Sequence, residues 1–331
     1  MSAVQAAAQA VVQAGGEPAT RLMIELEQRL EELATGHGPL LARHAGDTIA
    51  AGGKRLRPLL LFLAAGAPPP ESAALLRAAV AVELIHSATL VHDDVLDGSP
   101  LRRGRPTVMA SGGRLAATAT GDLLFSRAFA ELGRSRSLAA VRVLSRAASE
   151  LAAGELMQRS DAWEAVAIER YLERCRLKTA VLFRAACELG AIESRVRAGT
   201  ANGTRTSALA AFGERIGLAF QLLDDVLDVS GPPERTGKPQ GADLLDGTVN
   251  LPLIIARERD PELRAVDPRS IRTAHQAAGI CVQIIQTGAL EVARSRALDL
   301  VALAKESLPD LPVRQRAALT LIADGVVERY S

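Results

Sequence analysis

Aromatic residues are scarce in this chain: Phe, Trp and Tyr together account for 3% of its 331 residues. Strands are enriched in aromatic and β-branched side chains, whereas Ala, Leu and Arg, which are abundant here, favour helices. Alternating strand patterns and hairpin dipeptides are lacking as well. We therefore expect an all-α protein.

Cysteine is also rare, and charge of either sign is not in excess. Cys175, Cys187 and Cys281 are widely spaced and form no Cys-x-x-Cys pair. Their odd number and spacing argue against a disulfide framework or a zinc site and fit reduced thiols in a cytoplasm. The net charge of +1 gives no global reason to expect nucleic acid or an anionic membrane as a partner.

Long uncharged apolar runs are lacking: none reaches the length of a membrane span. Residues 1–16 are rich in Ala, Gln and Val but have neither a basic start nor a sustained apolar core, so they do not read as a signal peptide. We expect residues 1–19 to form a flexible extension, residues 20–331 to form one domain, and the protein to be soluble and cytoplasmic.

Gly and Pro clusters divide the chain into about ten to twelve helical segments. No break resembles an interdomain linker. The segments 73–91 and 216–227 are apolar nearly all round, which is typical of central, buried helices. The simplest expectation is one helical bundle.

The most informative feature present is the acidic pentad Asp-Asp-Val-Leu-Asp, which occurs at Asp93–Asp97 and again at Asp224–Asp228. In a helix the first and fifth residues of each pentad share a face. Turn residues follow each copy, so the carboxylates fall near a helix C-terminus, where the backbone dipole disfavours negative charge. This arrangement predicts bound cations, and hard oxygen ligands with room for waters and a phosphate suit Mg²⁺.

An acidic cluster at a helix end is more often a solvated surface, and that alternative has to be weighed. The residues before the pentads, Leu90–His92 and Phe220–Leu223, are too apolar for an ordinary exposed face. Two identical pentads in such settings favour metal binding.

Basic loops accompany the pentads. Leu101–Pro106 follows the first pentad, Gly237–Gly241 follows the second, and Gly52–Pro58 places cations and backbone donors at a predicted helix start. Arg offers a planar fork for phosphate oxygens and Lys a mobile point charge. The combination suggests a diphosphate bridged to carboxylates by Mg²⁺, with an apolar tail lying along the helices that lead to the pentads.

In this order the motifs resemble those of the trans-prenyltransferases, the isoprenyl (polyprenyl) diphosphate synthases. The matching positions are Gly52–Pro58, His86, Asp93–Asp97, Arg102-Arg103-Gly104, Gly154-Glu155, Lys178-Thr179, Phe220-Gln221, Asp224–Asp228, Gly237-Lys238 and Asp243.

The resemblance implies an isoprenoid synthase-type helical bundle around a central cavity. It implies condensation of isopentenyl diphosphate with an allylic diphosphate (1'-4, trans), about three Mg²⁺ ions per site, and a homodimer or a hetero-oligomer. The implied metal-binding residues are Asp93, Asp94, Asp97, Asp224, Asp225 and Asp228, of which Asp93, Asp97 and Asp224 bind directly. Those implied at the allylic diphosphate are Arg102, Lys178, Thr179 and Lys238, with Gln221 as a neighbour. Those implied at isopentenyl diphosphate are Lys54, Arg57, His86 and Arg103. The catalytic set is Asp93, Asp97, Asp224, Lys178 and Arg102.

Product length in this family depends on the side chains below the first pentad. Thr89 and Ala88, four and five residues before Asp93, are small, and Ile85 lies one turn deeper. From Ala88 to Ala78 the helix rises about 15 Å at about 1.5 Å per residue, room for roughly three isoprene units. We expect a product of about C30 to C40, with Leu144 a candidate for the floor. Geranylgeranyl diphosphate, C20, is the alternative.

Thr248 departs from the family pattern, because many short-chain members carry a Lys in this stretch. Two further alternatives remain. A class I terpene cyclase would pair one acidic motif with an Asn/Ser/Glu-type motif and lack the Gly52–Pro58 segment. A non-catalytic or regulatory subunit would have eroded acidic motifs, whereas both pentads here are intact.

Overall fold

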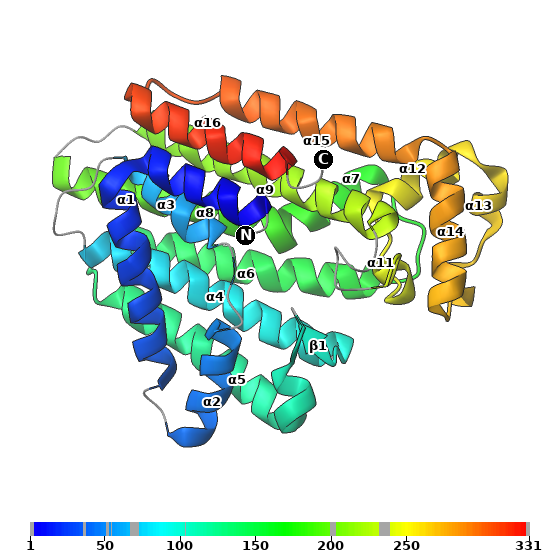
Figure 1. Ribbon diagram of the computed structural model, residues 1–331, viewed down its shortest axis with the longest axis horizontal. Helices are drawn as coiled ribbons and strands as arrows, with labels where there is room; N and C mark the ends of the chain where they lie inside the picture. The colour runs from blue at the N-terminus through cyan, green and yellow to red at the C-terminus, as the bar shows by residue number, and fades with distance from the viewer. Residues whose placement is uncertain are drawn as a thin grey trace. The chain divides into compact units, whose positions relative to one another are not determined.

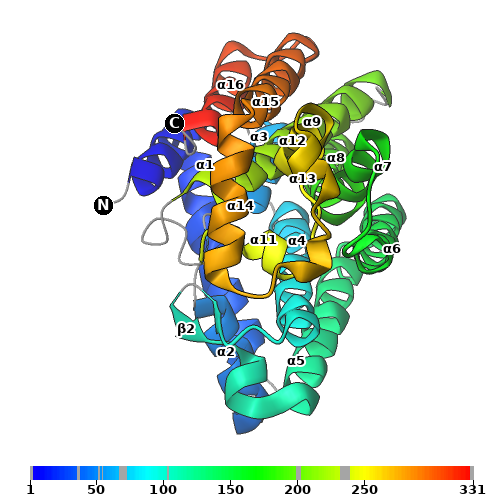
Figure 2. The same cartoon turned by 90° about the vertical axis from the view of Figure 1, so that its right-hand side faces the viewer.

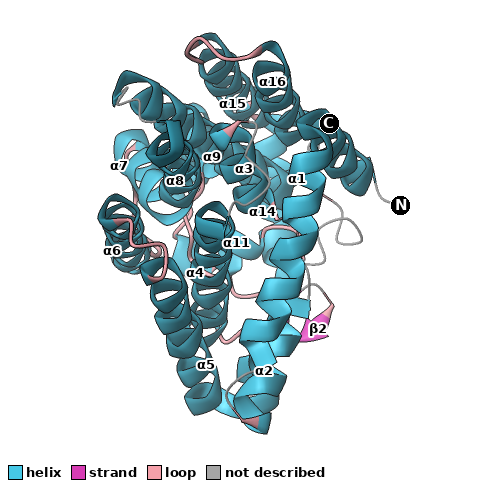
Figure 3. Ribbon diagram, turned by 90° about the vertical axis from the view of Figure 1, so that its left-hand side faces the viewer, coloured by secondary structure: helices cyan, strands magenta, loops and turns pink. Residues whose placement is uncertain are grey.

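The computed structural model describes residues 3–35, 38–50, 53, 55–66, 73–102, 104–198, 203–231 and 239–328. These residues are helical apart from short connections and one antiparallel pair of two-residue strands, β1 (Leu101–Arg102) and β2 (Arg105–Pro106), as Figure 3 shows. The all-α expectation is confirmed. Two compact units share the chain.

The first unit comprises Met1–Ala148, Leu182–Gly213 and Leu308–Gly325. The helices that lie wholly or mainly in it are α1 (Ala3–Thr35), α2 (Pro39–Ala50), α3 (Leu56–Ala65), α4 (Ala73–Asp97), α5 (Val108–Gly133), α8 (Val181–Ala198) and α16 (Val313–Glu328), labelled in Figure 1. The helices α6 (Leu138–Asp161) and α9 (Gly203–Ser230) begin in this unit and end in the second.

Helix α4 is the core of the first unit. It packs along α5 and against α3, and it is buried on most of its circumference from Ala78 to Ala88. By length and composition α4 could cross a membrane, with a mean hydropathy of 1.6 over its most apolar window. The expectation concerned uncharged apolar runs, and α4 is not one, because Arg77 and Glu83 interrupt it. Because 67% of that window is buried inside the protein, we interpret α4 as a core helix.

Helix α1 runs through the predicted boundary at residue 19. Its backbone leaves the helical region at Gly16, where φ is 77°. A positive φ suits glycine, and Pro18 lies two residues later. The extension over residues 1–19 stays a prediction.

The second unit comprises Ser149–Val181, Glu214–Ser307 and Val326–Ser331. Its further elements are α7 (Ile168–Cys175), the π-helix η1 (Arg176–Ala180), α11 (Ala242–Leu245), α12 (Leu251–Arg259), α13 (Pro261–Ala265), the 3₁₀ turn η2 (Pro268–Ser270), α14 (Ala274–Gln286) and α15 (Ala289–Glu306). Helix α14 contacts α11, α12, α13 and α15, and Figure 2 shows it in front of this group.

The predicted punctuation is confirmed where the structure describes it. Helix α12 ends before Asp260-Pro261, and α16 begins after Pro312. Helices α4 and α9 end at and just after the pentads, at Asp97 and Ser230. Both acidic motifs therefore lie at helix C-termini, as expected.

Candidate active site

The first pentad forms the last turn of α4. Its second residue, Asp94, is 4% exposed; its Oδ1 accepts a hydrogen bond from Arg102 Nε at 2.9 Å and forms an ion pair with Arg102 Nη2 at 2.8 Å. Asp93 is half-buried and Asp97 is exposed. The β1–β2 turn thus carries Arg102 back onto the helix end, and the second carboxylate is used to hold it there.

The second pentad, near the end of α9, divides its residues in the same way. Asp225 is 3% exposed, whereas Asp224 and Asp228 are half-buried. Three donors surround the Asp225 carboxylate: Tyr171 Oη at 2.6 Å, Gln221 Nε2 at 2.8 Å and the backbone N of Leu251 at 3.4 Å. The second aspartate of each pentad is therefore buried, while the first and fifth are more accessible, although Asp228 Oδ2 also accepts a hydrogen bond from the backbone N of Asp243 at 3.3 Å.

Burial dominates the electrostatics of this carboxylate. Burial, together with the charge of Asp243, raises the pKa of Asp225 to about 7, against the lowering effect of the hydrogen bonds from Tyr171 and Gln221. Burial and the neighbouring Asp225 also raise the pKa of Tyr171 well above its usual value. The tyrosine hydroxyl therefore keeps its proton and donates a hydrogen bond to Asp225 over the physiological range.

Lys178 and Thr179 lie on the π-helix η1. Lys178 Nζ is 2.5 Å from Glu155 Oε2. A Cβ on Gly154 would lie 2.7 Å from the Lys178 backbone N, so glycine is required for this close approach of α6. Thr179 Oγ1 donates to Gln221 Oε1 at 2.7 Å. The structure thus joins Lys178 to Glu155, and Thr179 to Gln221 and, through it, to Asp225.

The basic segment before α3 contains two arginines in different settings. Arg55 is 7% exposed and donates to Glu27, Glu83 and the carbonyl of Ile49. Arg57 is half-buried, with its guanidinium carbon 4.5 Å from the centre of the Phe183 ring. The three predicted substrate residues Lys54, Arg103 and Lys238 lie outside the described residues.

The predicted chain-length residues lie on helices of the first unit. Ala88, Ile85 and Leu144 are fully buried, and Thr89 is half-buried. Thr89 Oγ1 donates to the carbonyl of His86 at 2.8 Å, so its hydroxyl is satisfied within α4. The half-buried His86 lies on the same helix, seven residues or about two turns before Asp93.

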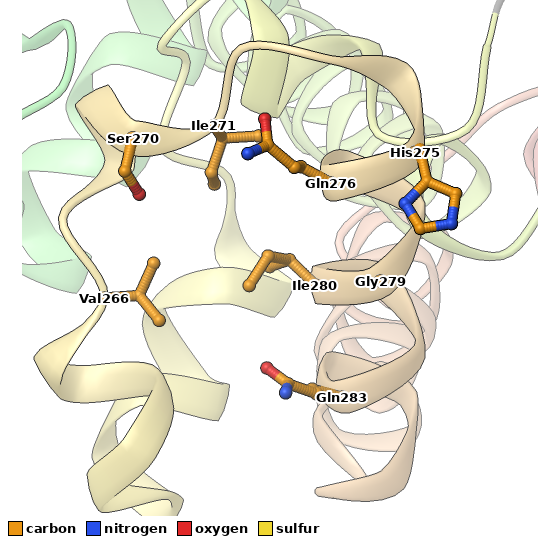
Figure 4. Close-up of a pocket in the computed structure, with 8 residues that line it drawn as sticks. All are labelled: Val266, Ser270, Ile271, His275, Gln276, Gly279, Ile280 and Gln283. Carbon is orange, nitrogen blue, oxygen red and sulfur yellow. The ribbon is translucent and has the colours of Figure 1, made fainter.

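A separate surface pocket of about 400 Å³ lies in the second unit, beside α14 (Figure 4). Apolar side chains and amides line it, among them Val266, Ile271, Gln276, Ile280 and Gln283. It contains no carboxylate, Lys or Arg and none of the predicted site residues. The pocket does not suit a diphosphate.

Some residues of the site were not predicted from the sequence. The most important is Tyr171, whose partner Asp225 is 54 residues away. No local pattern marks that contact. Helix geometry turns the residue after Asp93 or Asp224 by about 100° from it, but it does not indicate that this residue is buried.

Comparison with known proteins agrees with these observations. Residues 39–288 match the family described as polyprenyl synthetase. The heptaprenyl diphosphate synthase component 2 of Geobacillus stearothermophilus is 39% identical over 281 residues, which cover 82% of this chain and 84% of that protein. The geranylgeranyl diphosphate synthase of Methanosarcina mazei is 35% identical over 290 residues, covering 85% and 87% respectively.

A solved structure is similar over almost the whole chain. A polyprenyl synthase from Caulobacter crescentus, complexed with calcium and isoprenyl diphosphate, superposes with a TM-score of 0.88 at 35% identity. The match covers 97% of this chain and 98% of that one.

Proposed function

The chain belongs to the polyprenyl synthetase family, and on that basis we propose that it condenses isopentenyl diphosphate with an allylic diphosphate to give a longer trans-polyprenyl diphosphate. One observation carries the proposal beyond family membership. In both pentads the second carboxylate is tied to internal donors, and the first and fifth are left more accessible at a helix end. This pattern supports a shared role for the two motifs.

The donor set fits Mg²⁺. Among the described residues, no three His, Cys, Asp or Glu side chains are grouped so that they could hold a metal ion by themselves. Mg²⁺ is usually held by one or two carboxylates together with substrate phosphates and waters, so a complete protein cage is not required. We assign Asp93, Asp97 and Asp224 as direct ligands and Asp94, Asp225 and Asp228 as supporting carboxylates. When bound, Mg²⁺ would neutralise the charge of the diphosphate leaving group.

The cationic side chains act on the same charge. Breaking the allylic C1–O bond leaves a carbocation and a diphosphate with additional negative charge. We assign Arg102, Lys178, Thr179 and Lys238 to the allylic diphosphate. Arg102 is already held by Asp94, and Lys178 by Glu155, so both need little reorganisation when charge develops.

The second substrate supplies the electron pair. The double bond of isopentenyl diphosphate attacks C1, and the proton lost from the adduct passes to the departing diphosphate. We assign Lys54, Arg57, His86 and Arg103 to the isopentenyl diphosphate. The reaction needs no side-chain nucleophile.

We propose a product of about C30 to C40, with C20 as the alternative. Small residues at Ala88 and Thr89 support the longer product. The relative from Geobacillus stearothermophilus, a heptaprenyl synthase component, falls within that range, whereas the one from Methanosarcina mazei makes geranylgeranyl diphosphate. We further propose a cytoplasmic homodimer. Assembly with a different second subunit is the alternative, because one relative is named as a component.

The test is condensation by the purified chain with labelled isopentenyl diphosphate, farnesyl diphosphate and Mg²⁺. We expect incorporation by the wild type and a loss of at least about a hundredfold in kcat for Asp93→Asn and for Asp224→Asn. Asp299→Asn, an exposed aspartate on α15, is the matched control and should behave as wild type. Full activity of both pentad variants would overturn the assignment.

A further inference from the structure

The Asp225 carboxylate is held from three segments of the second unit. Tyr171 on α7 and the backbone N of Leu251, at the start of α12, donate to Oδ2, and Gln221, one turn earlier on α9, donates to Oδ1. Both oxygens are thus engaged, and the residue is 3% exposed. A carboxylate in this setting is a structural hub.

Tyr171 is well placed to control that hub. Its side chain is 1% exposed, and the Arg174 guanidinium lies 5.5 Å from its ring centre. Arg174 in turn donates to the carbonyl of Val249, two residues before Leu251. Helix α7 therefore fixes the start of α12 and the pentad turn of α9 together.

The contacts close into a ring. Helix α7 runs directly into η1, where Thr179 donates to Gln221. Gln221 donates to Asp225, and Asp225 accepts from Tyr171, which lies eight residues before Thr179. The α7–η1 segment thus contacts one turn of α9 at two residues, Gln221 and Asp225. Single π-turns of this kind are frequent at functional sites.

We propose that Tyr171 is a positioning residue for the second pentad: through Asp225 it fixes the last turn of α9 so that Asp224 faces the metal and η1 presents Lys178. This inference rests on the proposed function. It assigns Asp225 a role through its hydrogen bonds and not through its charge. Partners that orient metal ligands without touching the ion typically change metal affinity by about 10- to 100-fold when removed.

Asp225→Asn separates these two roles. Asn keeps an oxygen that accepts from Tyr171, and its amide can donate to Gln221 Oε1 once the glutamine side chain is flipped. The flipped glutamine amide then donates to Thr179 Oγ1, so every link of the ring survives, and only the two links through Gln221 reverse their direction. Asp225→Ala breaks the ring completely.

The experiment measures Mn²⁺ binding to the full-length protein by electron paramagnetic resonance, with inorganic pyrophosphate present. We expect Tyr171→Phe and Asp225→Ala each to weaken Mn²⁺ binding about tenfold or more, and Asp225→Asn to weaken it by less than about threefold. Thr120→Val removes another buried hydroxyl hydrogen bond, from Thr120 to the carbonyl of Ala116 on α5. This control should match the wild type.

Two results would overturn the inference. The first is wild-type Mn²⁺ affinity in Tyr171→Phe. The second is a loss in Asp225→Asn as large as that in Asp225→Ala, which would make Asp225 a ligand by charge. The comparison of Asp225→Asn with Asp225→Ala still tests the inference if Tyr171→Phe does not fold. Condensation by the wild type is measured in parallel, so failure of the proposed function, with neither turnover nor Mn²⁺ binding, is distinguished from failure of the positioning role alone.

Discussion

Arg55 and Arg57, two residues apart in the segment before α3, should respond to the same substitution in opposite ways. Arg55 is 7% exposed, with its donors directed to Glu27 at 2.6 Å and to Glu83 at 2.7 Å. Glu83 is itself 3% exposed. Arg55→Gln would leave a buried carboxylate without its cation.

Removing one partner of a buried ion pair costs about 3–5 kcal/mol of the free energy of unfolding. At about 2 °C per kcal/mol, the lower figure corresponds to a fall of about 6 °C in Tm. Because the hydrogen-bond partners of Arg55 are Glu27, Glu83 and the carbonyl of Ile49, we expect KM for isopentenyl diphosphate to change by less than about twofold in the folded protein, well under the tenfold that 1.36 kcal/mol would give.

Arg57→Gln should change the free energy of unfolding little and raise KM for isopentenyl diphosphate. The Arg57 guanidinium packs on the Phe183 ring, and a partly exposed cation–π contact is worth about 0.5–2 kcal/mol. A hydrogen bond to a charged phosphate is worth about 1.5–3 kcal/mol, so Arg57→Gln should raise KM for isopentenyl diphosphate by about 10- to 100-fold.

Urea unfolding followed by circular dichroism, together with steady-state kinetics, measures both effects. Arg77→Gln is the matched control, because the side chain of this arginine on α4 is partly exposed and its Nε lies 3.9 Å from Glu131 Oε1. It should change stability by less than about 1 kcal/mol. The reasoning is refuted if Arg55→Gln unfolds like the wild type while raising KM.

Three further changes test other parts of the structure. Ala88→Phe should shorten the product to C20 or less, as judged by chromatography of the dephosphorylated prenols; unchanged products with a stability loss of about 1–3 kcal/mol would mean that Ala88 serves helix packing alone. Burial raises the pKa of Cys187 and of Cys281 from 9.0 to about 12, so both thiols stay protonated in the folded state and should resist iodoacetamide at pH 8.5. The free energy of unfolding should fall as the pH rises from about 9 toward 12, because only the unfolded chain ionises in that range. Rapid labelling of the native protein would contradict this. Gly190→Ala places a Cβ 2.2 Å from the carbonyl oxygen of Leu61, so it should lower the midpoint of urea unfolding because α3 and α8 pack too closely for it. A wild-type midpoint would show that these two helices can separate at little cost.

Much of the fold could be predicted because it rests on local rules. A composition poor in aromatics and rich in Ala and Leu indicated helices, and Gly and Pro clusters marked several of their ends. The end of α4 at Asp97 followed from the turn residues behind it. The three cysteines are free, as their spacing indicated, and the structure shows that they are also buried.

The sequence predicted which residues belong to the candidate site, but not which of its aspartates are buried and hydrogen-bonded. Asp94 and Asp225 were grouped with the other pentad carboxylates, yet their burial depends on Arg102 and Tyr171. Arg102 lies eight residues away and was predicted to contact substrate, whereas Tyr171 is 54 residues away and has no local signature. Periodicity reports which face a residue occupies, but it does not report which distant side chain completes its hydrogen bonds.

The apolar character of α4 illustrates the same limit of sequence reasoning. The run Ala73–Asp97 is apolar because it is surrounded by protein, and composition alone does not distinguish that environment from lipid.

Chain length of the product is the most direct test of the central claim. The purified protein would be given labelled isopentenyl diphosphate, Mg²⁺ and a farnesyl or geranylgeranyl primer, and the products would be separated by size. The account predicts polyprenyl diphosphates longer than C20, of about C30 to C40. Absence of incorporation with either primer would contradict the assignment of this chain as a synthase that acts without a second subunit.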